Sequence, residues 1–266
     1  MPHSQDPSTP RLKQEAAYHN ITKSPKMAQN AVVPAHKVDV SDISFSKDVK
    51  TLESGFKMVY GKYKGGSPIV LQLPTMKAPF GVSGWTNDKG VIEKYSLDLS
   101  FNGMDSSEKL SSTYELFKGI DDLVVTTALE NSTEWFKKRY TSKEVMEALY
   151  TPIVKVPKDD KYAPTIKLPL KEVPGGGGFT CAAFDTNRNK LDLKSANCKG
   201  SDVTAIVNLS HIWIAGGKFG VSWKVSQLRV QLKPSLDEYA FVDDDEVPVP
   251  VAAAGHFDGD SDDLDV

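Results

Sequence analysis

The chain has 266 residues, 39% of them hydrophobic, which is enough for a real core in one large domain or two small ones. Its formal charge of −3 averages two unlike parts, because residues 237–266 hold 11 of the 35 acidic residues and no Lys or Arg. Residues 1–236 therefore hold 32 basic and 24 acidic side chains, a net charge of about +8. A basic body with an acidic tail is typical of proteins that bind polyanions, and a tail that serves only solubility is the alternative.

The cysteines and the apolar pattern exclude several protein classes. Cys181 and Cys198 have neither the spacing of a zinc site nor the density of a secreted disulfide scaffold, so we predict reduced thiols. No apolar run reaches the length of a membrane span, and the N-terminus lacks the apolar core of a signal peptide. We therefore expect a soluble, intracellular chain with no membrane partner.

Both ends of the chain differ in composition from its centre. Residues 1–36 are rich in Pro, Ser, Gln and Asn without a sustained period, which predicts a disordered N-terminal extension. Met27 begins MAQNAVVP and is a second candidate start beside Met1. We expect a single domain over residues 37–236 and a disordered acidic tail over residues 237–266.

The first part of this domain is predicted to be β-rich. SGFKMVYGKY (54–63) and SPIVLQLP (67–74) indicate two strands, because their apolar residues flank a Lys/Gly-rich turn. VSGWT (82–86) and IEKYSLDLSF (92–101) follow as two further strands, and NDKG between them supplies the residues of a hairpin turn.

The middle of the chain is predicted to be helical. Apolar residues recur near helical spacing over residues 106–140, and Gly119 is expected to divide this stretch into two helices. TSKEVMEALY (141–150) opens with Thr141 and Glu144 at the spacing of a capping box, which predicts a short separate helix. We therefore expect a helical insertion over about residues 106–150.

Strands return after this insertion. TPIVKVP (151–157), APTIKLPLK (163–171) and FTCAAFD (179–185) read as strands, and the glycine-rich PGGGG between the last two reads as a flexible connection. Residues 203–232 contain two long β-rich runs that meet at AGGKFG, which predicts a hairpin. The pattern favours a mainly β fold with a helical insertion, namely an OB-fold-like Greek-key barrel, and a two-sheet sandwich is the alternative.

Catalytic and cofactor-binding motifs are missing from the sequence. Four of the five histidines fall in the predicted terminal regions, and neither a GxSxG elbow nor a phosphate-binding GxxxxGK[ST] loop occurs. The aspartates of DGDSDD near the C-terminus lack the full pattern of a calcium loop. The sequence therefore predicts a binding protein that is not an enzyme, with no catalytic residue, no metal and no cofactor.

Lysines interleaved with aromatic residues point to the kind of ligand. Single-stranded nucleic acid is bound by such sets, because cations contact the phosphates while aromatic rings stack on exposed bases. Some of these rings, such as Trp213 and Trp223, lie beside apolar neighbours and could instead belong to the core. The predicted binding residues are Lys57, Tyr60, Lys62, Tyr63, Lys64, Lys137, Lys138, Arg139, Lys218, Phe219 and Lys224.

Four stretches of the chain resemble a known family of proteins. The similarity covers about residues 45–232 and is most specific in the predicted hairpin. The family is that of single-stranded DNA-binding proteins of large nucleocytoplasmic DNA viruses, which is similar in turn to the single-stranded DNA-binding proteins of T-odd coliphages. The stretches are YSLDLSF (95–101), ENSTEWFKKRYTSKEVMEALYTPIVK (130–155), DKYAPTIKLPL (160–170) and KGSDVTAIVNLSHIWIAGGKFGVSWKVSQLRV (199–230).

The resemblance implies an oligonucleotide-binding barrel with a helical insertion and an acidic C-terminal tail. It also implies a role in coating exposed strands during viral DNA replication, recombination or repair, in the host nucleus or a cytoplasmic viral factory, or packaged in the virion. In the phage proteins an aromatic residue closes the tail, whereas this chain ends at Val266 and its last aromatic residue is Phe257.

The expected partners follow from this reading. Single-stranded DNA is the expected ligand, and the tail is expected to compete with DNA and to recruit a viral polymerase or helicase; a homodimer is also considered. The alternatives are a virion or assembly protein that uses the barrel for protein interactions, and an RNA-binding protein. The tail residues assigned to partner binding are Asp243, Asp244, Asp245, Asp260, Asp262, Asp263 and Asp265.

Overall fold

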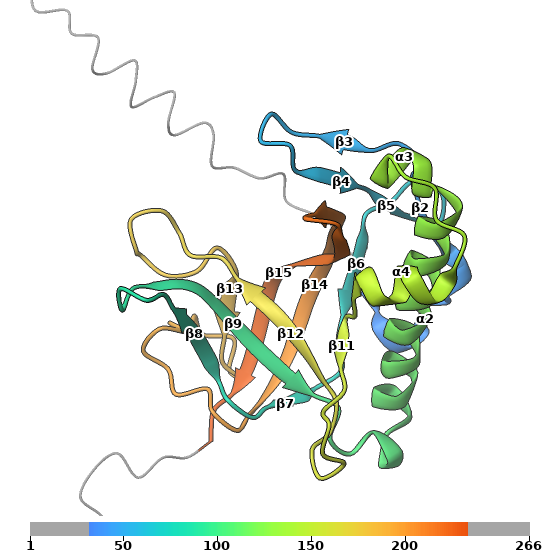
Figure 1. The fold of residues 1–266 in the computed structure, drawn as a ribbon. Coiled ribbons are helices and arrows are strands. Elements are labelled where there is room, and N and C mark those ends of the chain that lie inside the picture. The colour runs from blue at the N-terminus through green and yellow to red at the C-terminus, as the bar shows by residue number, and fades with distance from the viewer. Residues whose placement is uncertain (1–31, 234–266) are drawn as a thin grey trace, which may run out of the picture. The chain divides into compact units, whose positions relative to one another are not determined.

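Two long strands, β14 (Ser201–Ala215) and β15 (Lys218–Gln231), organise the sheet of this protein by pairing as one antiparallel hairpin. The computed structural model describes residues 32–233 (Figure 1). The turn between the two strands places Gly216 at φ 58° and Gly217 at φ 76°, a left-handed conformation that glycine adopts without strain. The hairpin predicted at AGGKFG is therefore confirmed.

The other strands build a curled sheet around this hairpin. β14 pairs with three strands besides β15, and Figure 1 shows the sheet curling into a partial barrel. The mainly β class with a barrel-like sheet and a helical insertion is confirmed. The remaining strands of the described chain are β1 (Val33–Pro34), β2 (Ile43–Phe45), β3 (Lys50–Thr51), β4 (Lys57–Val59), β5 (Gly61–Tyr63), β6 (Ile69–Gln72), β7 (Met76–Ala78), β8 (Val82–Thr86), β9 (Ile92–Ser100), β10 (Tyr150–Thr151), β11 (Val154–Lys155), β12 (Thr165–Leu170) and β13 (Ala182–Phe184).

Two predicted boundaries in the N-terminal part were wrong. The stretch 54–63 is two strands, because β4 pairs with β14 whereas β5 turns away to pair with β2 in a separate two-stranded sheet. The predicted N-terminal extension reached residue 36, but β1 pairs in parallel with β6 and Ala35 is completely buried. Residues 33–36 therefore belong to the fold, whereas the rest of that extension up to residue 31 and the acidic tail lie outside the described residues.

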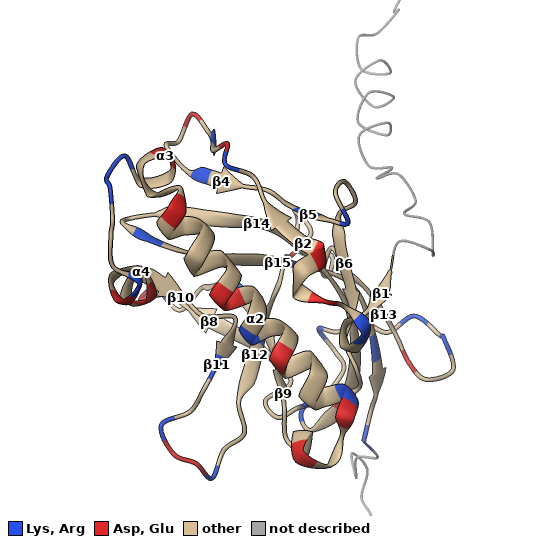
Figure 2. Cartoon of the chain, turned by 90° about the vertical axis from the view of Figure 1, so that its right-hand side faces the viewer, with Lys and Arg blue, Asp and Glu red and all other residues tan. Residues whose placement is uncertain are grey.

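The helical insertion lies within the predicted limits. Its long helix α2 crosses in front of β14 and β15 in Figure 2, so it covers one face of the hairpin. The α-helices are α2 (Glu108–Glu130), α3 (Ser132–Phe136) and α4 (Lys143–Leu149), and short 3₁₀ helices occupy Ala35–Lys37, Val40–Asp42 and Met104–Ser106.

Gly119 does not divide this helix, contrary to the sequence-based expectation. A Cβ atom at Gly119 would lie 2.6 Å from Cγ2 of Val40, far closer than two carbon atoms can approach. The missing side chain lets the segment before β2 lie close against α2. Glycine costs about 1 kcal/mol in a helix interior, and the packing of the long helix tolerates it here.

The predicted cap of α4 is displaced by one residue. Ser142, and not Thr141, is the N-cap, because its hydroxyl accepts a hydrogen bond from the backbone N–H of Val145. The same hydroxyl donates to the carboxylate of Glu144. The predicted helix exists, and it spans Lys143–Leu149 within the predicted residues 141–150.

The core fills the space between α2 and the inner face of the hairpin. The ring of Trp223, 5% exposed, meets that of Phe117 edge-on with 5.5 Å between centroids. Asp121 of α2 accepts hydrogen bonds from the Tyr150 hydroxyl (2.7 Å) and the Ile153 backbone N–H (3.0 Å). Burial raises the pKa of this carboxyl group above its usual range. These bonds join the insertion to the strands that follow it.

Candidate nucleic-acid interface

The outer face of the hairpin carries polar, aromatic and cationic side chains, whereas its inner face is apolar. This split follows from the two-residue period of a strand, because successive side chains point to opposite faces. We call the outer set the hairpin strip. It consists of Thr204, Ile206, Asn208, His211 and Trp213 on β14, and of Ser222, Lys224, Gln227 and Arg229 on β15.

The charge of the hairpin is almost entirely positive. Asp202 is the one acidic residue in β14 and β15, and its carboxylate pairs with Lys77 at 2.7 Å. His211 adds no charge at neutral pH, because burial lowers its pKa. Figure 2 shows that α2, on the other side of the hairpin, mixes several acidic positions with basic ones. A polyanion is therefore attracted more strongly to the strip than to the helix.

One end of the strip is a platform of aromatic side chains near the hairpin turn. The half-buried ring of Trp213 covers Gly220 of the paired strand, since a Cβ there would lie 2.9 Å from Cζ2 of the ring. Met58 of β4 pairs with Trp213 from the other side, and Phe56 meets His211 edge-on with 6.0 Å between ring centroids. Such flat, partly exposed surfaces are suited to stacking on a base.

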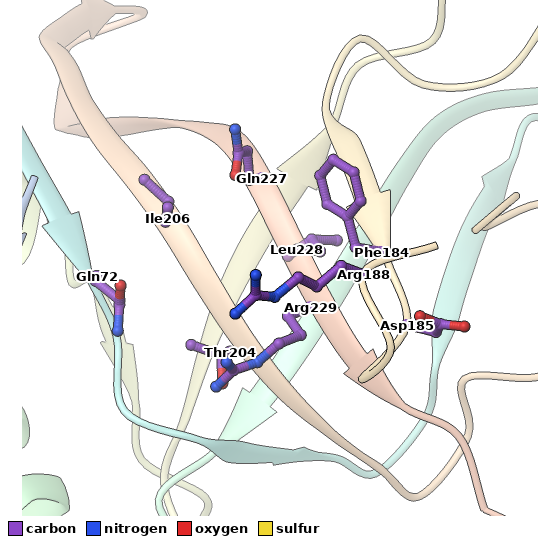
Figure 3. A pocket seen from close by; sticks show the side chains of 9 residues that line it. All are labelled: Gln72, Phe184, Asp185, Arg188, Thr204, Ile206, Gln227, Leu228 and Arg229. Carbon is purple, nitrogen blue, oxygen red and sulfur yellow. The ribbon is translucent and has the colours of Figure 1, made fainter. Parts of the chain in front are cut away.

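The other end of the strip is hollowed. A cavity of about 300 Å³ is lined by residues from β6, β14, β15 and the segment around β13 (Figure 3). Two neighbouring hollows, of about 160 and 340 Å³, share Thr204 and Arg229 with it. The three therefore adjoin one another and form a depression across the outer face of the sheet.

Two arginines meet in this depression. Arg229 donates a hydrogen bond to the hydroxyl of Thr204 at 3.3 Å, and Figure 3 shows the guanidinium group of Arg188 directed to the same place. Arg188 has φ 67° in a tight turn whose Asp185 carboxylate accepts hydrogen bonds from the side chain and backbone of Asn189. Those bonds lower the pKa of Asp185. None of the ion pairs found within residues 32–233 involves either arginine.

The residues predicted in the first hairpin all lie outside the strip. Lys57 points to the helical side, where its ammonium group donates to the carbonyl oxygen of Trp135 at 3.2 Å. Tyr63 is half-buried against the core, and Lys64 lies 5.3 Å from the centre of its ring. Lys64 also pairs with Asp42 at 3.6 Å. Tyr60 and Lys62 are exposed.

The residues predicted around the last hairpin divide into three groups. Lys224 lies in the hairpin strip, opposite Asn208. Phe219 was wrongly placed in a groove: it is completely buried, with Phe136 and Tyr150 against its ring, and cannot stack on a base. The remaining cations are exposed near the turn of the hairpin and after α3, and are Lys137, Lys138, Arg139 and Lys218.

Several residues of the interface were not predicted from the sequence. Arg229, Gln227 and Thr204 could have been found from the alternation of the two strands, because each lies at an outward position beside buried neighbours. Arg188 and Gln72 carry no such signal, since only the pairing of β13 with β15 and of β6 with β14 brings them together.

No curated protein matches this sequence. A family model described as "Family of unknown function (DUF5871)" matches residues 100–243. The chain belongs to this family. Its matched region includes the helical insertion and the whole hairpin, so the family covers the hairpin strip.

Solved structures were also compared with the chain. The single-stranded DNA-binding protein from bacteriophage Enc34 in complex with ssDNA is 11% identical, with a TM-score of 0.35, over 71% of this chain and 93% of that one. Gp2.5, a single-stranded DNA-binding protein encoded by bacteriophage T7, is 12% identical, with a TM-score of 0.40, over 65% of this chain and 98% of that one. Both are phage proteins of the kind that the resemblance named. These TM-scores are too low to carry a functional argument, which must come from the chain's own residues.

Residues 32–233 hold neither a candidate metal site nor a helix that could span a membrane. No group of three or more His, Cys, Asp or Glu side chains in that range is arranged to hold a metal ion. Among the helices described there, none is both long and apolar enough to span a membrane. The hairpin strip is thus the surface of this range with the clearest chemistry for a ligand.

Proposed function

We propose that this protein binds single-stranded nucleic acid along the hairpin strip and performs no catalysis. The observation that carries the proposal is the strip itself, which combines cations that form no ion pair within residues 32–233, a tryptophan platform and amide groups on one face of two strands. Cations would contact the phosphates, and Trp213 would stack on a base whose face is exposed only in a single strand. In a cell the protein would coat exposed strands during viral DNA replication, recombination or repair.

DNA is the favoured polymer, because the resemblance found in the sequence is to single-stranded DNA-binding proteins. RNA binding is the alternative, since stacking and phosphate contacts serve both polymers. Titrations with single-stranded DNA, duplex DNA and RNA at two salt concentrations would measure the affinity for each polymer and so distinguish these possibilities. We expect the tightest binding with single-stranded DNA, and preferential binding of the duplex would contradict the proposal.

The role of the strip is tested by removing Lys224, which lies in it, and Lys218, which lies beside it at the hairpin turn. Lys218→Ala/Lys224→Ala should weaken binding of single-stranded DNA and make its salt dependence shallower by up to about one unit for each lost phosphate contact. The matched control is Lys118→Ala/Lys155→Ala, which removes two exposed cations from α2 and β11. Equal losses in both variants would show that only the net charge matters and that the strand lies elsewhere.

The acidic tail is proposed to compete with DNA for the basic body. A tethered polyanion has an effective concentration on the order of millimolar near its own domain, and solvent ions screen its attraction beyond roughly 10 Å. Deleting residues 243–266 should therefore tighten single-strand binding at low salt, by an amount that shrinks as salt rises. The deletion should also abolish any contact with a basic partner such as a polymerase or helicase. A tail that serves only solubility predicts unchanged affinity and a more aggregation-prone protein.

A protein-interaction role is the second candidate, and the β8–β9 hairpin favours it. Phe80 and Trp85 are 62% and 57% exposed, and Val91 and Ile92 are exposed beside them. In the described sheet β8 pairs with β9 alone, so its other edge is open. An assembly built on this apolar surface, whether a homodimer or a virion contact, should respond little to salt, whereas strand binding should weaken steeply.

A further inference from the structure

The cavity at the end of the hairpin strip has an ordered lining of two rows. The first row runs across three paired strands, with Gln72 of β6 and Gln227 of β15 on either side of Ile206 of β14. Ile206 is only partly buried, so the floor between the two amides is apolar and accessible. An amide side chain offers both a donor and an acceptor, so this row suits a flat ligand with hydrogen-bonding groups on its edge.

The second row provides positive charge and one ring. Arg229 lies between Thr204 and Phe184 on neighbouring strands, and the turn after β13 directs Arg188 over the same place. Figure 3 shows the carboxylate of Asp185 pointing away from the cavity. Two guanidinium groups that converge with no ion-pair partner among residues 32–233 leave a position whose charge an anion can neutralise. Planar forks of this kind bind phosphate with two hydrogen bonds.

We propose that this cavity is a subsite for one nucleotide of the bound strand. The phosphate lies between Arg188 and Arg229, and the base lies on Ile206 with its edge toward the two glutamines. The volume of about 300 Å³ is at the lower end of the range for ligand pockets, which suits one nucleotide and not a longer segment. This inference rests on the proposed function and adds to it a contact that reads the base as well as the backbone.

The phosphate half is tested by Arg188→Ala, with Lys190→Ala as the matched control. Lys190 is an exposed cation two residues further along the same loop and does not line this cavity. Losing a bidentate contact should weaken strand binding about ten-fold, whereas losing the solvated lysine should cost about two-fold. Arg188→Lys should recover only part of the loss, because an ammonium group cannot make the planar contact. Equal effects of the two alanine variants would overturn the phosphate assignment.

The base half is tested with two strands of equal length, one of them abasic. Gln72→Leu/Gln227→Leu should weaken binding of the base-bearing strand about three- to ten-fold, as expected for lost amide hydrogen bonds. Binding of the abasic strand should change less than two-fold, and Arg188→Ala should weaken both strands alike. The control is Asn102→Leu, which removes an exposed amide after β9, outside this cavity and its two neighbouring hollows, and should leave both affinities unchanged.

The outcomes separate this inference from the proposed function. One outcome is that the native chain binds the base-bearing strand, but Gln72→Leu/Gln227→Leu weakens binding of both strands equally or of neither. The subsite inference is then overturned, whereas strand binding along the hairpin strip still stands. If the native chain binds neither strand, the proposed function fails and the inference with it. Inorganic phosphate and a free deoxynucleoside monophosphate serve as competitors, since a cavity for free nucleotides would be blocked by micromolar monophosphate and a strand subsite would not.

Discussion

Replacing Trp223 with alanine is expected to cost about 3–5 kcal/mol of unfolding free energy, the usual loss for a large buried aromatic side chain. The ring is 5% exposed and packs edge-on against Phe117 of α2, so its removal leaves a cavity between the hairpin and the helix. For a domain of this size the thermal midpoint should fall by about 10 °C or more. Denaturant and thermal unfolding followed by circular dichroism would measure both quantities.

Two further variants check the cause of that loss. Trp223→Phe keeps an aromatic ring against Phe117 and removes a buried indole N–H that has no hydrogen-bond partner in the described chain, so its cost should be much smaller. Trp85→Ala, at a position 57% exposed on β8, should change stability by less than about 0.5 kcal/mol. A thermal midpoint of Trp223→Ala equal to that of the native chain would show that this ring does not hold α2 against the hairpin.

The second tryptophan of the hairpin is expected to behave in the opposite way. Trp213 lies on the outer face, so Trp213→Ala should weaken binding of single-stranded DNA about ten-fold, in the range measured for one stacked base. Its half-buried ring should leave the thermal midpoint within a few degrees of the native value. Fluorescence titration of the strand, run beside a melting curve, would show both effects.

Conservative replacements identify the contact. Trp213→Phe keeps a flat ring and should restore most of the affinity, whereas Trp213→Leu keeps apolar bulk without a π face and should not. Trp85→Ala again serves as the control, because that ring is exposed but lies on β8, away from the hairpin. An unchanged affinity in Trp213→Ala would move the stacking surface away from the end of the strip near the turn.

The parts of the fold that sequence could predict are the local ones. The β14–β15 hairpin was predicted because its turn needs two residues with positive φ and its strands alternate, and both signals lie within one stretch of chain. Gly119 was read as a helix break because its reason lies elsewhere: Val40 packs against it from a segment almost eighty residues earlier. A pattern along the chain does not show such a contact.

The same difference between local signals and long-range contacts explains which residues of the candidate site could be predicted. Lys224 lies at an outward position of the hairpin, as a binding residue requires. Phe219, only five residues earlier, is covered by Phe136 and Tyr150 of the helical insertion and its following strand. Arg188 was missed because a cation in a polar turn looks like any solvated loop residue. Its convergence with Arg229 depends on β13 joining the edge of β15, which no local periodicity indicates.

The β14–β15 hairpin also sets an order for folding. Its two strands are joined by a two-residue turn, so they can pair within about 1–10 μs, whereas β4, β6 and β7 must reach β14 from over a hundred residues earlier in the chain. Contacts of such long sequence separation form slowly. While these long-range contacts form, the apolar inner face of the hairpin is uncovered. The chain is therefore most prone to self-association before α2 packs over that face.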